Sequence, residues 1–339
     1  MQTIHYFAGA NTAGGFCSRF ENIAPSRRRM FFIKGGPGVG KSSLMKRVGA
    51  AAEEKGLRVE YFHCSSDPDS LDGVSVPEKG VALMDGTAPH VYDPSVPGAR
   101  DTLLALGDYL DEQALRPHAR DIEQVQKRIS ERFARCYRYL AAAREVLHAA
   151  PRPQEDVQRV RQLSESWAHT LPLRGGQGSI RQLFGSSFTP RGYMTVTDFE
   201  DMDRCVTLDC PFGAHATQLM RTVSHMAAER GLDAVELLNP LCPEEIDHVL
   251  VPAHGVAFCT GARTRDSRGE WVDADALFKE TEADAEQRFD VNAFELLRQR
   301  AVEQLATAKT LHDELEAFYI RNMDFLGWQK ALDRVLEEL

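Results

Sequence analysis

The sequence predicts an α/β protein in which two related units, each with a mostly parallel sheet, are each followed by a helical hairpin segment. Three observations support this prediction. A glycine-rich loop separates a short apolar run from an amphipathic stretch, a set of residues recurs at a constant offset, and two long stretches carry apolar residues at spacings of three and four. The length of 339 residues fits two domains at the usual ~150 residues each.

The first unit opens with an apolar run that predicts a buried strand over Met30–Ile33. Apolar residues then recur at helical spacing from Ser42, and Gly56 marks the end of this helix. Residues 57–63 and 80–84 predict two further strands. A strand, a glycine loop, a helix and two strands in this order indicate a nucleotide-binding α/β domain.

The glycine-rich loop, GGPGVGKS, fits the phosphate-binding pattern G-x-x-x-x-G-K-[ST]. Glycines let consecutive backbone N–H groups turn toward a phosphate, and the start of the following helix adds positive charge at the same point. Lys41 is expected to reach the β- and γ-phosphates, and the Ser42 hydroxyl to bind Mg²⁺. The cofactors predicted are therefore ATP and Mg²⁺, with GTP as an alternative because no base-reading motif is evident. The expected nucleotide-binding residues are Gly35, Gly36, Pro37, Gly38, Val39, Gly40, Lys41, Ser42 and Ser43.

A phosphate loop needs a carboxylate near the metal, usually at the end of a neighbouring strand. Asp85 directly follows the apolar run 81–84, so it is the expected Walker B residue and second metal ligand; the alternative is that it only starts the turn Asp-Gly-Thr. Asp67 and Asp69 follow the strand 57–63 and are expected catalytic residues that position water or a second metal contact. For Asp72, which recurs in the second unit, a capping role and a catalytic role are both open.

Two further kinds of side chain are candidates for phosphate chemistry. His90 either senses the γ-phosphate or is an ordinary surface histidine. An arginine often compensates charge during phosphoryl transfer, and the sequence does not rank those available. They are Arg27, Arg28, Arg29, Arg100, Arg191 and Arg263.

The second unit is recognised as a repeat of the first. Leu44-Met45 recurs as Leu219-Met220, an offset of 175, and the same offset relates residues 80–82 to residues 255–257. At this offset Ala216 replaces Lys41 and Thr260 replaces Asp85. Without the lysine charge, nucleotide binding by the second unit is expected to be weak or absent, which leaves it a structural or regulatory role.

The helical segments lie after each unit. Apolar residues from Ile122 to Leu147 form one stripe, a second run begins after Pro153, and a similar stripe extends from Phe294 to Phe318. These patterns predict a helical hairpin at 99–173 and an acidic helical segment at 266–339, so that the two units occupy 1–98 and 174–265.

Composition restricts the compartment and the partners. Residues 270–339 contain 8 Lys and Arg against 17 Asp and Glu, and this acidity argues against nucleic acid and membrane surfaces as partners. The 7 cysteines form no CxxC pair, which indicates neither a disulfide framework nor a zinc knuckle. No signal-like N-terminus and no run of 18 apolar residues is present in the sequence, so a cytoplasmic protein is expected.

Several motifs together resemble those of a bacterial family of duplicated P-loop ATPases. They are FAGANTAGGF, FIKGGPGVGKSSLMK, HCSSDPDSLDG and the Asp-Gly-Thr-Ala-Pro-His element, followed by a helical segment and a second copy. The resemblance implies two tandem P-loop NTPase-like units and ATP binding, without a physiological role. In that family the second copy usually keeps its glycine-lysine loop, and this sequence departs from the pattern there.

The function predicted is a Mg²⁺-dependent ATPase whose phosphate state is transmitted to the helical segments. One alternative is a small-molecule kinase, in which the helical insert after Asp85 covers an acceptor as a lid. Another is a nucleotide-dependent interaction module that binds a protein partner through the helical segments without significant turnover.

Overall fold

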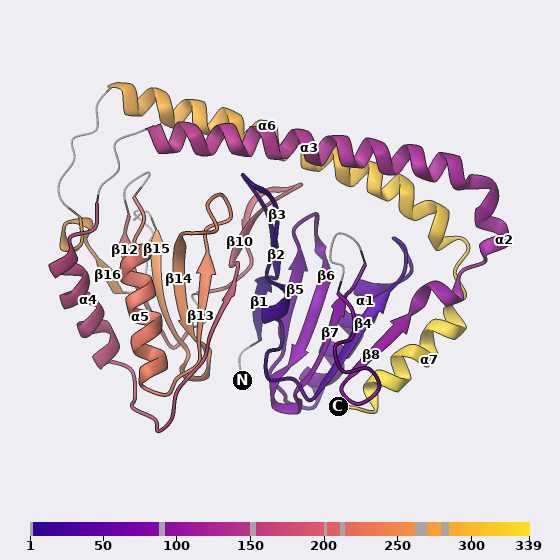
Figure 1. Ribbon diagram of the computed structural model, residues 1–339, viewed down its shortest axis with the longest axis horizontal. Helices are drawn as coiled ribbons and strands as arrows, with labels where there is room; N and C mark the ends of the chain where they lie inside the picture. The colour runs from indigo at the N-terminus through magenta and orange to yellow at the C-terminus, as the bar shows by residue number, and fades with distance from the viewer. Residues whose placement is uncertain are drawn as a thin grey trace.

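The computed structural model describes residues 3–87, 92–149, 154–199, 202–210, 214–261, 270–278 and 285–339. Two six-stranded sheets, one in each half of the chain, lie side by side, and a pair of long helices runs across both (Figure 1). The protein is therefore α/β, as predicted.

The first sheet has the order β1-β5-β6-β7-β4-β8. Strands β7, β4 and β8 are parallel, β1 and β5 are parallel, and β6 is antiparallel to both of its neighbours. The sheet is thus mixed rather than mostly parallel, because residues expected as a loop form the strand β6. The bounds are β1 (Ile4–Phe7), β4 (Arg29–Lys34), β5 (Glu60–Cys64), β6 (Asp67–Val76), β7 (Val81–Asp85) and β8 (Asp101–Ala105).

The second sheet repeats this order as β9-β13-β14-β15-β12-β16, with the same strand directions. Ile33 lies opposite Asp85 in the first sheet, and Leu208 lies opposite Thr260 in the second, which is the offset of 175 found in the sequence. The last strand of each sheet, β8 and β16, lies beyond the unit boundaries predicted at residues 98 and 265. The bounds are β9 (Ile180–Leu183), β12 (Arg204–Asp209), β13 (Ala234–Leu238), β14 (Ile246–Val251), β15 (Val256–Gly261) and β16 (Glu270–Val272).

The two units meet through equivalent residues. Phe7 and Phe184 exchange two backbone hydrogen bonds, of 2.8 and 3.0 Å. Nearby, two antiparallel ribbons cross, β2 (Gly9–Thr12) with β3 (Gly15–Ser18) and β10 (Ser186–Thr189) with β11 (Gly192–Thr195). Contact between equivalent positions is what a two-fold axis produces, so the chain is arranged like a symmetric dimer on one polypeptide.

The helices are exchanged between the units. α3 (Ala119–Ala149) and α6 (Ala285–Ile320) lie antiparallel across both sheets (Figure 1), and their apolar stripes face each other. The predicted hairpins within segments 99–173 and 266–339 are therefore wrong: α4 (Val157–His169) packs on α5 (Thr217–Glu229) of the second unit, and α7 (Phe325–Leu336) packs on α1 (Lys41–Glu54) of the first. The remaining helix, α2, is a single turn at Glu112–Leu115.

This exchange completes both hydrophobic cores. Trp328 and Leu332 of α7 are buried with Phe31 and Leu44 of the first unit, while Trp167 of α4 is buried in the second unit. The Trp167 ring stacks on Phe258 with centroids 5.0 Å apart. Each unit therefore depends on the other half of the chain for part of its core.

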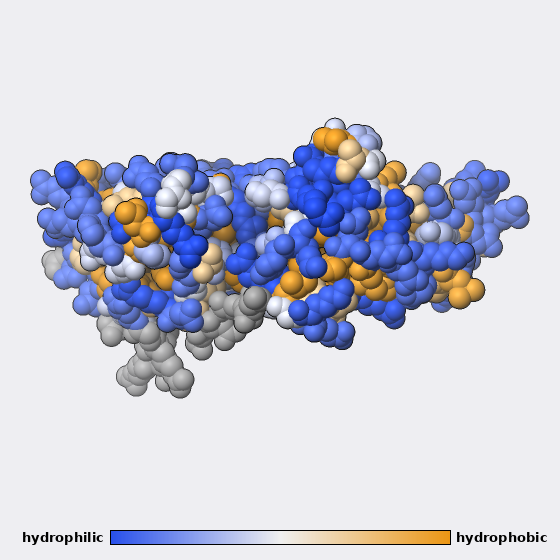
Figure 2. Space-filling view, turned by 90° about the horizontal axis from the view of Figure 1, so that it is seen from below, coloured by the Kyte–Doolittle hydropathy of each residue, from blue (hydrophilic) through white to orange (hydrophobic). Residues whose placement is uncertain are grey.

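The surface facing away from the α3–α6 pair is mostly hydrophilic, with hydrophobic residues in separate groups (Figure 2). Among the helices of the described residues, none has the length and apolar character needed to cross a bilayer.

Candidate functional site

The glycine-rich loop joins the end of β4 to the start of α1, which is where the sequence places it. Gly38 and Gly40 have φ angles of +72° and +85°, a region that L-residues rarely adopt. β4 is buried through Met30–Ile33, so the sheet fixes the start of the loop. The backbone thus has the order of strand, glycine-rich loop and helix that the sequence predicts.

The Lys41 side chain folds back over the loop. Its Nζ donates to the carbonyl oxygens of Gly35 and Gly36, at 2.9 and 2.8 Å, and lies 3.6 Å from Oδ2 of Asp85. An ammonium group has three N–H donors, so these contacts hold it in place while leaving it able to meet a phosphate oxygen. The side chains of Lys41 and Asp85 are only 13% and 15% exposed, which strengthens their attraction.

Asp85 occupies the last position of β7, beside β4. Its Oδ1 accepts a hydrogen bond of 2.8 Å from the Thr87 amide, and the Thr87 hydroxyl donates to the Gly35 carbonyl at 3.1 Å. Asp85 therefore both starts the turn and faces the loop lysine, so the two interpretations of this residue are compatible.

The Ser42 hydroxyl has a structural partner as well as its expected metal role. It accepts a hydrogen bond of 3.0 Å from the amide of Leu71 in β6. In the second unit Thr217 accepts the equivalent bond, of 3.1 Å, from Ile246. Since this contact persists where the lysine is lost, it belongs to the fold. A hydroxyl oxygen has a second lone pair, which remains suitable for a hard cation such as Mg²⁺.

The loop is covered by the C-terminal helices. The Trp328 indole donates to the Gly40 carbonyl at 3.2 Å. A Cβ atom at Gly36 would lie 2.9 Å from the Tyr319 ring, and one at Gly38 would lie 2.7 Å from Ile320. The end of α6 and the start of α7 are thus in van der Waals contact with the outer surface of the loop, and the sequence gives no sign of this contact.

The acidic residues after β5 are engaged by other parts of the chain. Asp67 accepts from Ser70 and lies 3.6 Å from Lys309 of α6, and Asp69 pairs with Arg191 of the second unit. Asp72 is buried at 5% exposure, and its charge contributes to the raised pKa of the Cys64 thiol after burial. Asp67 and Asp69 therefore take part in ion pairs with α6 and with the second unit, and their expected catalytic role stays a prediction.

The candidate arginines have structural partners. Arg27 and Arg100 pair with the buried Asp101, and Arg28 and Arg29 pair with Glu338. His90 and Arg263 lie outside the described residues. The basic residues of α6 near the acidic segment after β5 are different ones: Lys309 lies 3.6 Å from Asp67, and burial lowers the pKa of His312.

The second unit lacks the residues from which a phosphate site is predicted in the first unit. His215 stands at the Gly40 position, and no described non-glycine residue has a positive φ, so the loop backbone differs there. A carboxylate from the chain itself occupies the start of α5: Glu155 accepts from the amides of Gln218 and Leu219, both at 2.8 Å. An anion is thus already bound at the helix N-terminus, which favours a structural role for this unit.

Replacing Glu155 with alanine is expected to destabilise the protein by about 1–3 kcal/mol, because two backbone amides at the start of α5 lose a charged acceptor. α4 should then separate more readily from α5. Urea unfolding and limited proteolysis between α3 and α5 measure the two effects. Glu165→Ala is the matched control, since Glu165 is half exposed and pairs with Arg161 one turn away on α4. Equal effects of the two substitutions would contradict the anchoring role of Glu155.

No protein-family model, curated protein or solved structure matches the chain.

Proposed function

We propose that the protein is a Mg²⁺-dependent ATPase that binds ATP at the loop from Gly35 to Ser43. The observation that carries the proposal is the position of the Lys41 Nζ, which is fixed by two loop carbonyls and lies 3.6 Å from Asp85. Residues 35–43 would surround the phosphates through backbone N–H groups, and Lys41 would stabilise negative charge as the terminal phosphoryl group leaves.

The Ser42 hydroxyl and the Asp85 carboxylate fit a magnesium ion, which prefers oxygen ligands. Such an ion would neutralise charge on the phosphate oxygens. The Thr87 amide holds one Asp85 oxygen, and the Leu71 amide holds the Ser42 oxygen, so both groups are oriented before a ligand binds.

The covering helices offer a route from the nucleotide to the long helical pair. Tyr319 and Ile320 end α6, the helix that runs back over both units, and Trp328 lies in the first turn of α7, the helix that completes the first core. A shift of the loop on nucleotide binding would therefore change its contacts with both helices. This arrangement supports transmission by α6 and α7, whereas α3, the insert expected as a lid, runs away toward the second unit (Figure 1).

Calorimetry with Mg²⁺-ATP and a phosphate-release assay test the proposal. One nucleotide per chain and slow phosphate release are expected, with GTP as the comparison for base preference. Transfer of phosphate to an added metabolite would favour a kinase, and tight binding without turnover would favour an interaction module. Absence of triphosphate binding would overturn all three.

Substitutions of Ser42 separate its two roles. Ser42→Thr should keep turnover within a few-fold, because Thr217 accepts the equivalent backbone hydrogen bond in the second unit. Ser42→Ala should weaken the apparent Mg²⁺ affinity at least about 10-fold, since one oxygen ligand is lost. A Mg²⁺ titration of phosphate release measures both variants. Unchanged Mg²⁺ dependence in Ser42→Ala would exclude Ser42 as a ligand.

A further inference from the structure

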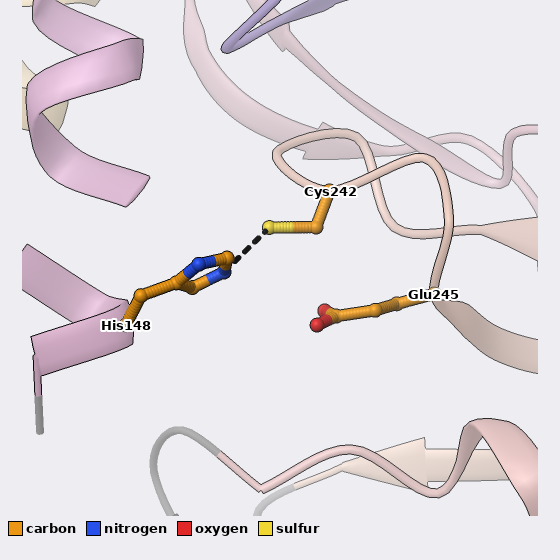
Figure 3. A group of neighbouring side chains, drawn as sticks. All are labelled: His148, Cys242 and Glu245. Atoms are coloured by element: carbon orange, nitrogen blue, oxygen red, sulfur yellow. Dashed lines mark hydrogen bonds between the residues drawn. The ribbon is translucent and has the colours of Figure 1, made fainter. Parts of the chain in front are cut away.

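A second cluster of reactive side chains lies in the second unit, away from the loop of the first. It consists of His148 at the end of α3 and of Cys242 and Glu245 in the segment between β13 and β14. Figure 3 shows that the three side chains converge from these two parts of the fold. One ligand atom from each lies within 4.8 Å of the others.

The distance between the histidine nitrogen and the cysteine sulfur equals that between two ligand atoms of one zinc ion. His148 Nε2 and Cys242 Sγ are 3.6 Å apart. Zinc bonds of about 2.0–2.1 Å to nitrogen and about 2.3 Å to sulfur, at a tetrahedral angle, place those atoms roughly 3.5–3.6 Å from each other. The two atoms therefore already have the spacing they would have as ligands of one ion.

The segment that carries the other two ligands is ordered by its own hydrogen bonds. Asn239 Oδ1 accepts from the amides of Leu241 and Cys242, at 2.9 and 3.0 Å. The Glu245 amide donates to the Cys242 carbonyl at 2.9 Å, which closes a turn between the two ligands. Because this turn fixes the backbone at both ligands, metal binding would cost little further conformational entropy.

A fourth residue, His215, lies next to the cluster. His215 Nδ1 lies 2.7 Å from Glu245 Oε2, so the imidazole is adjacent to this carboxylate. Its Nε2 is buried and has no hydrogen-bond partner among the described residues. His215, which replaces Gly40 of the first unit's loop, thus lies beside the cluster.

In the first unit, the position equivalent to Cys242 is paired with a positive charge from a long helix. At the offset of 175, Asp67 corresponds to Cys242, and there the ammonium of Lys309 in α6 lies 3.6 Å from the Asp67 carboxylate. In the first unit a lysine thus joins the long helix to the segment after the second strand. A metal ion would make the same connection in the second unit, between α3 and Cys242.

We propose that His148, Cys242 and Glu245 bind one zinc ion, with water as the fourth ligand, and that this ion fastens the end of α3 to the second unit. A thiolate, an imidazole and a carboxylate together favour Zn²⁺ over Mg²⁺ or Ca²⁺, which prefer oxygen ligands only. His148 is exposed, so the ion has a path from solvent, while Cys242 is buried. The proposal is independent of the ATPase, because the ligands lie in the other unit.

Cobalt titration of the full chain, stripped of metal with a chelator, tests this site. Cobalt should bind one ion per chain and give a thiolate-to-cobalt charge-transfer band with the visible spectrum of a tetrahedral ion. Zinc should then displace it, and Mg²⁺ should not. Cys242→Ser should abolish the charge-transfer band, and His148→Gln should weaken binding at least about 10-fold.

Cys17→Ser is the matched control, because Cys17 is a half-buried cysteine on β3 outside the cluster. His148→Gln changes an exposed side chain, so its effect does not depend on a loss of folding. If the unaltered protein binds no stoichiometric cobalt, or if the band survives in Cys242→Ser, the site does not exist. If the unaltered protein binds cobalt but does not hydrolyse ATP, only the proposed ATPase function is contradicted.

Discussion

Lys41→Ala is expected to lower Mg²⁺-ATP turnover by about 10²–10³-fold, the usual cost of removing one preorganised charge-stabilising donor. The Lys41 ammonium lies against the loop, where it donates to the carbonyls of Gly35 and Gly36. Alanine has no charge to offer the leaving phosphoryl group. Phosphate release under saturating ATP measures the change in the chemical step, and calorimetry measures the change in binding.

Lys46→Ala is the control for this experiment. Lys46 lies exposed on the same helix, α1, so it carries the same charge without facing the loop. Its turnover should equal that of the unaltered protein. The unfolding temperature of Lys41→Ala should stay close to that of the control, which separates loss of chemistry from loss of fold. Parent-like turnover in Lys41→Ala would remove the basis of the proposed function.

Arg181→Met is expected to destabilise the protein by about 3–5 kcal/mol, which is typical for breaking a buried ion pair. Arg181 of β9 donates to Glu60 of β5 through two nitrogens, one bond measuring 2.9 Å, and also to the Asn22 carbonyl. The side chains are only 15% and 2% exposed. Removing the guanidinium would leave the Glu60 charge buried between the two units.

The double variant Glu60→Gln/Arg181→Met should recover most of this loss, because it removes the unpaired charge. Arg204→Met is the surface control: its pair with Glu270 is 34% and 52% exposed, so a change of about 0–1 kcal/mol is expected. Urea unfolding measures all three variants. An equal cost for Arg181→Met and Arg204→Met would show that the buried pair does not hold the units together.

Local patterns predicted those parts of the fold that local sequence determines. The run Met30–Ile33, the helix after Ser42 and the strand ending at Asp85 are all present, because burial and turn residues specify each within a few positions. β6 was missed because it begins with Asp67, Pro68 and Asp69, which are typical of turns. Its pairing comes from β5 and β7 on either side.

The partners of the helices were beyond a local pattern. The stripe on α3 would fit any helix with the same spacing, so periodicity does not distinguish α4 from α6 as its partner. Likewise, His148 and Cys242 are separated by 94 positions, and no spacing rule connects a single histidine with a single cysteine. Such contacts follow from tertiary structure.

The position of α7 also affects how the protein acquires its shape during synthesis. Trp328 is 288 positions away from Gly40, which it contacts, so the first unit emerges from the ribosome long before its last core residues exist. Until then the part of the α1 surface that α7 covers must remain in water or be shielded by a chaperone. Contacts this distant in sequence slow folding, and a nascent chain halted before α7 is expected to be sensitive to proteases.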